Sequence, residues 1–248
     1  MSFWLALANL LALGIPVLLC ASDLPARAPA DGREVSAPRA SGPPAPDVAR
    51  DDSGPRIRVL GTVQDGGLPH AACACARCEA ARRDPSLRRW IASLAVIFPA
   101  DQKVFLIDAT PDIRPQLDAL TDARPRPAES VDRAPLDGVL LTHAHMGHYT
   151  GLMFLGFEAV NARDLLVFCT PRMTRFLRSN GPWDQLVRLG NVTLREARPG
   201  RSFTLHGEVA VTPLAVPHRE EYTDTVGYLL RGPRVRGPAR RAGVSAVI

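Results

Sequence analysis

The pattern of apolar and polar positions divides the chain into three regions. An uncharged apolar run extends from Phe3 to Cys20, and the stretch after it is rich in Pro, Ala, Asp and Arg without apolar periodicity. A run of this length nearly spans a bilayer or forms the apolar part of a secretory signal, whereas such a polar stretch buries too little apolar surface to offset its ordering entropy. We therefore expect a signal peptide or membrane anchor over 1–21, a disordered linker over 22–55, and a folded domain from residue 56.

Within the folded region, short β-rich runs alternate with helical ones. Residues 92–98 and 103–108 flank the turn sequence PADQ and predict a hairpin. Thr110 and Pro111 predict the N-cap and first position of a helix that extends to residue 120. Further strands are predicted over 57–62, 136–142, 165–170, 191–196, 209–217 and 225–231, and further helices over 149–160 and 171–180. Strands that outnumber helices but alternate with them predict an α/β domain, with a mixed sheet covered by helices or a layered αββα architecture.

Composition and charge narrow the range of partners. The 248 residues are 46% hydrophobic and 22% charged, which is typical of a globular chain with one main domain. The net charge of +5 comes almost entirely from scattered arginines, since Lys103 is the only lysine. Arginines are concentrated only over 231–241, without aromatic residues that could stack on bases, so we expect a small-molecule substrate and no nucleic-acid partner. Residues 232–248 are predicted to form an irregular basic tail.

Three of the six histidines fall within one short stretch behind an apolar strand. His143 and His145 are two positions apart, so an extended backbone points both rings to the same side. His148 follows where a helix should begin, and His218 follows the end of another apolar strand. Neutral imidazoles suit Zn²⁺ or Fe²⁺, and a catalytic zinc site generally has three protein ligands. The alternative is that these histidines cap a strand and face solvent.

A second cluster of potential ligands is Cys73-x-Cys75-x-x-Cys78. Three thiols at this spacing suit one structural zinc and are too close for a conventional disulfide framework. A disulfide with one thiol left over is the alternative in an exported protein. His70 is the nearest candidate for a fourth ligand. We expect Cys169 to be a buried apolar residue, and Cys20 belongs to the targeting segment.

The segment Thr142 to His148, with the sequence THAHMGH, resembles the HxHxDH motif of the metallo-β-lactamase superfamily, whose fold is an αββα sandwich. The stretches VLGTVQDGGLPHAACACARC, LIDATPDIRPQLDAL and HYTGLMFLG resemble its pyrroloquinoline quinone biosynthesis B branch. VTPLAVPHREEYTDTVGYLL resembles the strand that carries the third histidine in the superfamily's phosphodiesterases. The resemblance covers about residues 56–231. It also supports zinc on the cysteine triplet, because several relatives hold a structural zinc with such a triplet and a distant histidine.

The resemblance implies that His143, His145 and His218 hold one metal, while the motif's Asp, His148 and later ligands hold a second. Gly147 stands where the motif has its Asp, so we expect the second site to lack a carboxylate and the substitution Gly147→Asp to restore it. Asp108 follows a strand end near the family's cavity, and we expect it to hydrogen-bond a ligand imidazole. Asp112 is expected to be an ordinary first-turn carboxylate.

The superfamily also has a bridging Asp and another His beyond the position of Leu230. The sequence there is RGPRVRGPARRAGVSAVI, without an apolar period that could complete a second sheet. We therefore expect a C-terminally incomplete sandwich whose open edges favour homodimerisation or aggregation. A naturally minimal domain is the alternative.

These features predict an exported, periplasmic or extracellular, or membrane-anchored metal-dependent hydrolase. A metal-activated water would attack an ester-type or phosphodiester bond. Two alternatives remain: an accessory protein of the pyrroloquinoline quinone B type with one metal and redox chemistry, and a catalytically silent metal-binding module. The expected metals are one catalytic and one structural Zn²⁺, with Fe²⁺ as the alternative at the histidines.

Overall fold

The computed structural model describes residues 53–234 and 243–247. The predicted signal peptide or anchor over 1–21 lies outside these residues, as does nearly all of the predicted linker. No helix in the described part of the chain has the length and apolarity needed to cross a bilayer.

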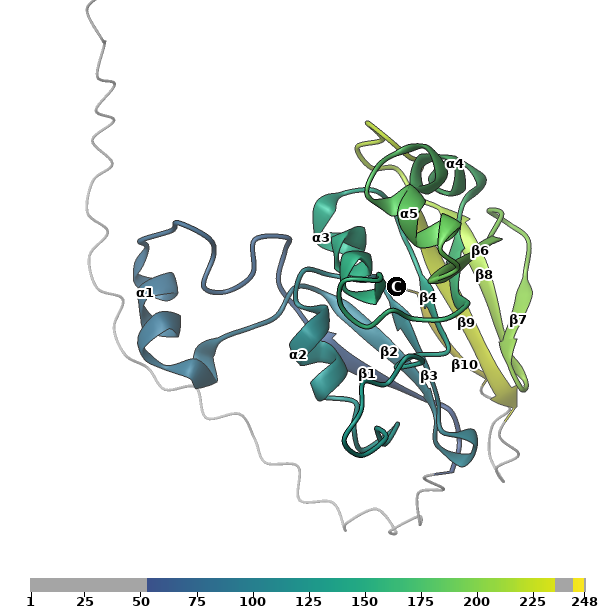
Figure 1. Ribbon diagram of the computed structural model, residues 1–248, viewed down its shortest axis with the longest axis horizontal. Helices are drawn as coiled ribbons and strands as arrows, with labels where there is room; N and C mark the ends of the chain where they lie inside the picture. The colour runs from purple at the N-terminus through teal and green to yellow at the C-terminus, as the bar shows by residue number, and fades with distance from the viewer. Residues whose placement is uncertain (1–52, 235–242, 248) are drawn as a thin grey trace, which may run out of the picture. The chain divides into compact units, whose positions relative to one another are not determined.

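A six-stranded sheet contains the first strands of the domain in chain order (Figure 1). Its strands are β1 (Arg56–Gly61), β2 (Ser93–Phe98), β3 (Lys103–Ile107), β4 (Gly138–Leu140), β5 (Leu165–Cys169) and β6 (Val192–Glu196). The first three strands are antiparallel, which includes the predicted hairpin of β2 and β3, and β3 to β6 are parallel. Because parallel strands end at the same edge, the residues that follow β3 and β4 are brought together there.

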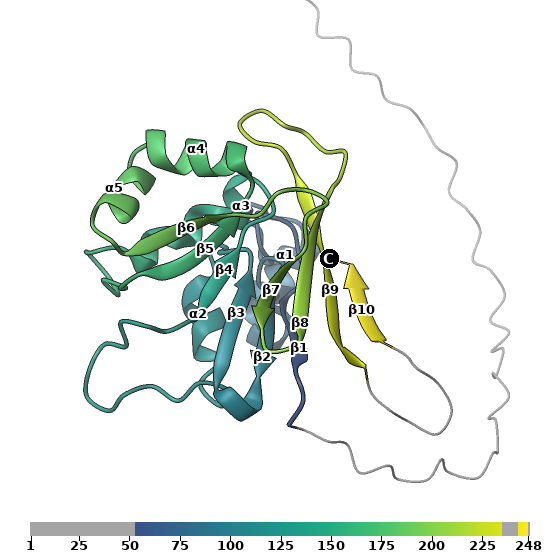
Figure 2. The same cartoon turned by 90° about the vertical axis from the view of Figure 1, so that its right-hand side faces the viewer.

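The second sheet has four antiparallel strands in the order β10, β9, β8, β7. They are β7 (Phe203–His206), β8 (Val209–Ala215), β9 (Val226–Arg234) and β10 (Gly243–Val247). Its buried Val211, Tyr228 and Leu230 pack with Phe105 and Ile107 of the first sheet in one apolar cluster. Figure 2 shows the two sheets side by side. The functional residues that follow β4 and β8 therefore come from different sheets.

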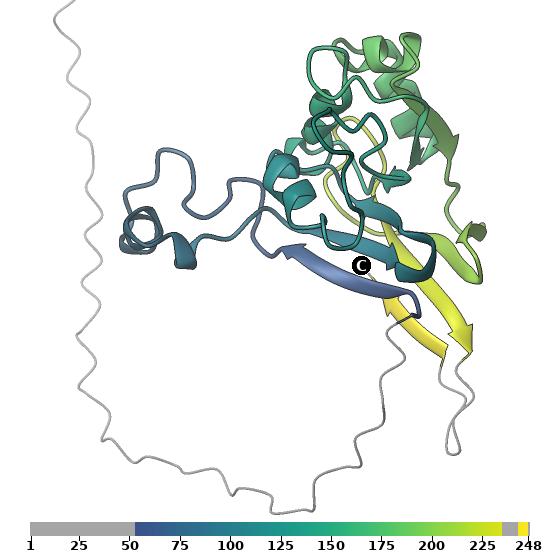
Figure 3. The ribbon, with the colours of Figure 1, turned by 60° about the horizontal axis from the view of Figure 1, so that its bottom comes forward.

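The helices pack on the other face of the first sheet, where Ile113, Met173, Leu177 and Leu186 share a core cluster with alternate residues of β2 to β5. They are α2 (Ile113–Asp118), α3 (Met146–Tyr149), α4 (Pro171–Ser179) and α5 (Trp183–Arg188), while α1 (Ala76–Arg83) lies in the β1–β2 connection. Figure 3 shows that connection extending to one side of the sheets. Short 3₁₀ segments occupy Pro85–Leu87, Pro99–Asp101 and Thr150–Leu155. The layered α/β architecture predicted from the sequence is confirmed.

Several local predictions differ from the structure. The helix predicted from Thr110 begins at Ile113: the Thr110 hydroxyl accepts from the Asp112 amide, as an N-cap does, but residues 111 and 112 form a turn before the helix. The helical stretch predicted from residue 149 begins at Met146 and continues in 3₁₀ form. Helix α5 and strand β7 were not predicted.

The prediction of an irregular tail over 232–248 is wrong for its described part. Strand β9 continues to Arg234, and β10 pairs antiparallel with it. The prediction followed the many arginines, glycines and prolines of this stretch. The sequence GVSAV of β10 consists of valines and small residues, which form a strand readily once the edge of β9 offers hydrogen-bond partners.

Candidate metal centre

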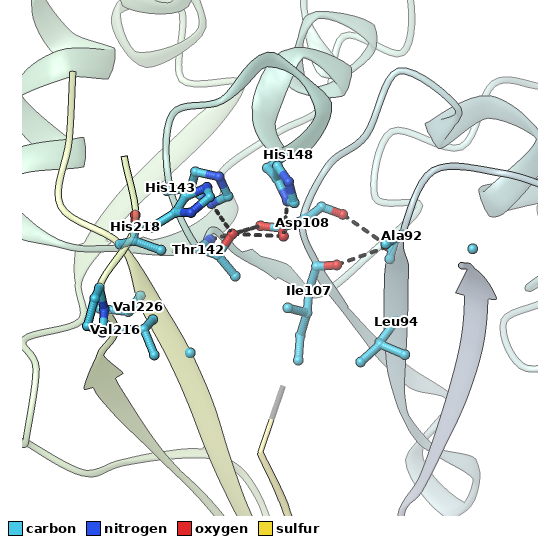
Figure 4. Close-up of a pocket in the computed structure, with 15 residues that line it drawn as sticks. Ala92, Leu94, Ile107, Asp108, Thr142, His143, His148, Val216, His218 and Val226 are labelled. Atoms are coloured by element: carbon cyan, nitrogen blue, oxygen red, sulfur yellow. Dashed lines mark hydrogen bonds and ion pairs between the residues drawn. The ribbon is translucent and has the colours of Figure 1, made fainter. Parts of the chain in front are cut away.

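The histidine cluster is assembled at the edge where β4 ends and the β8–β9 loop arrives. After β4 the chain continues to Thr142, whose carbonyl accepts the Val226 amide of the second sheet at 3.1 Å. The segment between β4 and α3 carries His143 and His145, while His218 comes from the loop between β8 and β9. Figure 4 shows His143 and His218 on the same side of a cavity, with Asp108 between Thr142 and His148.

Three ring nitrogens converge in this cluster. His145 Nδ1 lies 3.0 Å from His143 Nε2 and 3.2 Å from His218 Nε2. Ligands about 2.1 Å from a tetrahedral zinc are separated from each other by ~3.4 Å, so the spacing is close to that of a ligand set.

The outer hydrogen bonds of these rings leave lone pairs at the centre of the cluster. His143 Nδ1 donates to the Thr142 hydroxyl at 2.8 Å, and His145 Nε2 donates to Glu221 Oε2 at 2.9 Å. These partners assign the protons to the outer nitrogens, so His143 Nε2 and His145 Nδ1 face each other as acceptors. A cation between them would satisfy both lone pairs, and the donor set therefore fits a metal.

Burial and neighbouring charge keep His143 neutral. Desolvation, followed by repulsion from the protonated forms of His148, His145 and His218, lowers the pKa of His143 to about 3. The neutral imidazole is the form that ligates metals, so this environment favours a cation over a proton at Nε2.

Asp108 lies at the centre of the supporting hydrogen bonds. Its buried carboxylate accepts from the Thr142 amide at 2.8 Å, from the Thr142 hydroxyl at 2.9 Å and from His148 Nδ1 at 2.7 Å. Its backbone has a φ of +64°, a left-handed conformation that costs roughly 1–3 kcal/mol in a non-glycine residue. The structure thus places Asp108 where it links His148 to the residue that supports His143.

His148 does not point its nitrogens into the group of three histidines. Its Nδ1 is occupied by Asp108, and its Nε2 lies 3.4 Å from Asp65 Oδ1. Burial acts against its charge, but the hydrogen bond and charge of Asp108 raise the pKa of His148 overall. The His143 and His148 rings are nevertheless close, with centroids 4.2 Å apart.

Sequence reasoning missed Glu221, Thr142 and Asp65. Glu221 orients His145, and that hydrogen bond lowers the pKa of the Glu221 carboxyl. Glu220 and Glu221 follow His218 closely in the sequence, but no known spacing indicates which histidine either carboxylate would bond. Asp112 is not the first-turn carboxylate expected from the sequence: it stands at the N-cap of α2, and its carboxylate accepts the Ile91 amide at 2.8 Å.

Two cavities of small-molecule size flank the histidines. One of about 570 Å³ lies beside His143, His148 and His218 and extends between the sheets. The other, of about 600 Å³, lies beside His145. Its other lining residues are largely aromatic or charged: Asp65, Tyr149, Phe176, Trp183, Arg219, Glu221 and Tyr222.

The cysteine cluster is a local structure at the start of α1. The sulfurs of Cys73, Cys75 and Cys78 all lie within 4.8 Å of one another, and no cysteine in the described ranges forms a disulfide. A backbone hydrogen bond from Cys78 and hydrogen bonds with the neighbouring thiols lower the pKa of Cys75 to about 7. A thiol that ionises this readily is suited to bind a metal. Cys169 is buried, as expected, and burial raises its pKa to about 12.

The structure does not bring the His70 ring into this group. The His70 amide donates to Cys78 Sγ at 3.3 Å, but the ring Nδ1 contacts its neighbouring carbonyl at 2.9 Å. The ring instead lies against Gly66, where an added Cβ would be 2.1 Å from Nε2. His70 therefore supports the cluster through its backbone.

Residues 103–237 match the family model described as the beta-lactamase superfamily domain, and the chain belongs to this superfamily of metallo-β-lactamase-fold, metal-dependent hydrolases. Within it, the chain is PqqB-like. Coenzyme PQQ synthesis protein B of Rhodopseudomonas palustris (strain TIE-1) is 41% identical over 132 residues, which cover 53% of this chain and 41% of that protein.

Two solved structures agree with this placement. Zn(2+)-bound PqqB from Methylobacterium extorquens has a TM-score of 0.59 at 25% identity, covering 71% of this chain and 61% of that one. A diphosphatase from the PhnP family has a TM-score of 0.52 at 25% identity, covering 71% and 62%. The chain thus spans less than two thirds of the length of these relatives.

Proposed function

We propose that this protein is a metal-dependent hydrolase that acts on an ester-type or phosphodiester bond of a small molecule. The observation that carries the proposal is the convergence of His143 Nε2, His145 Nδ1 and His218 Nε2, with the lone pairs of the first two directed inward. Three neutral imidazoles suit zinc and leave a coordination position free. When bound, zinc supplies Lewis acidity and lowers the pKa of a water molecule enough to make it a nucleophile near neutral pH.

The chain's own residues orient the ligands and offer a binding surface for substrate. Glu221 and Thr142 fix the two rings of the β4–α3 turn, and Asp108 holds His148 beside them. The cavity next to His145 combines aromatic side chains with the guanidinium of Arg219. The cavity also carries the carboxylates of Asp65 and Glu221, so its lining suits a substrate with an apolar part and one anionic group placed at Arg219, such as a phosphate or carboxylate.

A second candidate function comes from the relatives, several of which are named Coenzyme PQQ synthesis protein B. In that case one metal, with iron as the candidate, would take part in redox chemistry on a small molecule. The metal that copurifies separates the two functions, since zinc has no redox chemistry of its own. A protein that binds metal without turnover would be a metal-binding module.

The cysteine cluster, in this proposal, holds a separate structural zinc through Cys73, Cys75 and Cys78.

We further propose that the protein is exported or membrane-anchored, on the basis of the apolar run over 3–20. We also propose that it forms a homodimer. Light scattering of the purified chain tests the last point, because a monomer at micromolar concentration would contradict it.

The test of the hydrolase proposal is turnover of an activated phosphodiester and an activated ester by the zinc-loaded chain. We expect His218→Ala to lower turnover by at least ~100-fold, which equals about 2.7 kcal/mol of barrier. The matched control is His206→Ala, since His206 lies outside the cluster and pairs with Asp101. Full zinc occupancy without turnover of either substrate would exclude hydrolysis of these bonds, and copurified iron would favour the redox function.

A further inference from the structure

Gly147 is buried, and the space that its side chain would occupy is already filled. A Cβ added there would lie 2.5 Å from both Cγ and Oδ1 of Asp65. Asp65 lies 82 positions earlier in the chain, in a different connection. A carboxylate therefore stands beside the backbone of residue 147, but a different part of the sequence supplies it.

The loop after β1 holds Asp65 in this position. The Thr62 amide bonds the Trp90 carbonyl at 3.0 Å, and the Leu68 amide bonds the Arg89 carbonyl at 3.1 Å, which anchors both ends of the loop on one segment. Between them, the Gly67 amide closes a turn on the Gln64 carbonyl at 2.9 Å. Gly67 has a φ of +72°, which favours glycine in the sequence QDGG. This glycine-rich turn thus serves to present Asp65 to the first turn of α3.

His148 is the partner of this carboxylate. Its Nδ1 bonds Asp108, so in the neutral ring Nε2 carries the lone pair, and Nε2 lies 3.4 Å from Asp65 Oδ1. This separation matches the ~3.4 Å expected between two ligands of one tetrahedral cation. The Asp65 side chain is 42% exposed and lines the cavity beside His145, while His148 lines the cavity beside His143, so each partner faces a cavity from which a cation can enter.

We propose that Asp65 supplies the metal-ligating carboxylate that Gly147 lacks and that Asp65 and His148 together hold a second divalent cation. The inference rests on the proposed function, because this cation would lie next to the one held by the three histidines. A carboxylate oxygen and an imidazole nitrogen suit zinc or manganese. Glycine is required at 147 because any side chain there would displace Asp65. The substitution Gly147→Asp alone therefore collides with an existing carboxylate and does not restore a missing one.

The experiment is a carboxylate swap with metal content as its readout. Full-length wild-type protein and variants are dialysed against zinc, and bound zinc per chain is measured by elemental analysis. Asp65→Gly should lose one equivalent relative to the wild type, and the double variant Asp65→Gly, Gly147→Asp should regain it. Gln64→Gly loosens the same turn without removing a carboxylate, so it should keep the wild-type content. Circular dichroism verifies that each variant is folded.

The outcomes separate this inference from the proposed function. If His218→Ala loses an equivalent while Asp65→Gly keeps the wild-type content, Asp65 only forms an ion pair with His148 and the inference is wrong. A folded double variant that stays at the content of Asp65→Gly would also overturn it, because the two carboxylates would not be interchangeable. If His218→Ala keeps its metal as well, the proposed histidine site itself fails.

Discussion

The cysteine cluster and the histidine cluster each bring three ligand atoms together, but the chain builds them in opposite ways. Cys73, Cys75 and Cys78 lie within one turn at the start of α1, and their geometry follows from local sequence. The three histidines lie in two connections, one after β4 and one after β8. Strands β4 and β8 belong to different sheets. Their convergence depends on the packing of those sheets, so the histidine cluster reports on the whole fold and the cysteine cluster on a single loop.

The supporting groups differ in the same way. The cysteine cluster is supported by backbone amides, those of His70 and Cys78. The histidine cluster is supported by the side chains of Asp108, Thr142 and Glu221, two of which are carboxylates. Carboxylates around ligand imidazoles fix the tautomer and raise ligand basicity, so the histidine cluster should be tunable by substitutions that remove no ligand.

The largest effect is expected from Cys75→Ser, which removes a ligand from the cysteine cluster. Structural zinc contributes on the order of 10 kcal/mol in small modules, so the variant should lose one zinc equivalent, and the loop around α1 should become sensitive to protease. The zinc held by the histidines should stay. Elemental analysis and thiol titration in denaturant with chelator measure this. The control is Cys169→Ala, which removes a buried thiol outside the cluster and should keep the zinc content of the wild type.

A smaller effect is expected from Asp108→Asn, which changes the histidine cluster alone. Asn tolerates the left-handed backbone at this position but cannot carry the charge that holds His148. Zinc affinity at the histidines should fall about 10–100-fold, while the cysteine cluster keeps its zinc. Because Asp108 raises the pKa of His148, that pKa should fall in the metal-free variant, as measured by an NMR titration.

The matched control for that variant is Asp112→Asn, since Asp112 bonds the Ile91 amide and no histidine. Equal losses of affinity in both variants would mean that Asp108 acts only through general stability.

The smallest effect is expected from Glu221→Gln. Glu221 is half exposed, so solvent partly replaces its support of His145, and the loss of zinc affinity should be about tenfold, at the lower end of the range for such residues. Competition with a chromophoric chelator measures the difference. Glu220→Gln is the comparison, because Glu220 faces Arg172. An unchanged affinity in Glu221→Gln would show that the hydrogen bond does not orient the ligand.

The contrast between the clusters also explains what the sequence could predict. The hairpin of β2 and β3, the parallel strands and α4 follow from apolar periodicity and from turn sequences such as PADQ. The cysteine group follows from spacing alone. For the histidines, a motif and a strand end identified the ligand residues. The hydrogen bonds that orient their rings come from Glu221 and Thr142, and these depend on tertiary packing that the sequence pattern does not show.

Asp65 shows the limit of motif reasoning. A motif compares positions along one segment, so Gly147 in place of the motif's Asp indicated a missing ligand. In the structure, the Asp65 carboxylate from the loop after β1 occupies the space of that side chain. The tail was misjudged for a related reason. A short run of valines and small residues becomes a strand only when a neighbouring edge is available, and β9 provides that edge.

The most direct test of the account is anomalous diffraction at the zinc absorption edge from crystals of the zinc-loaded chain. We predict one peak among His143 Nε2, His145 Nδ1 and His218 Nε2 and a separate peak among the three cysteine sulfurs, with a further peak between Asp65 and His148 if the second cation is zinc. A peak at the cysteines with none at the histidines would contradict the central claim, because a folded chain would then bring those nitrogens together for a reason other than metal binding.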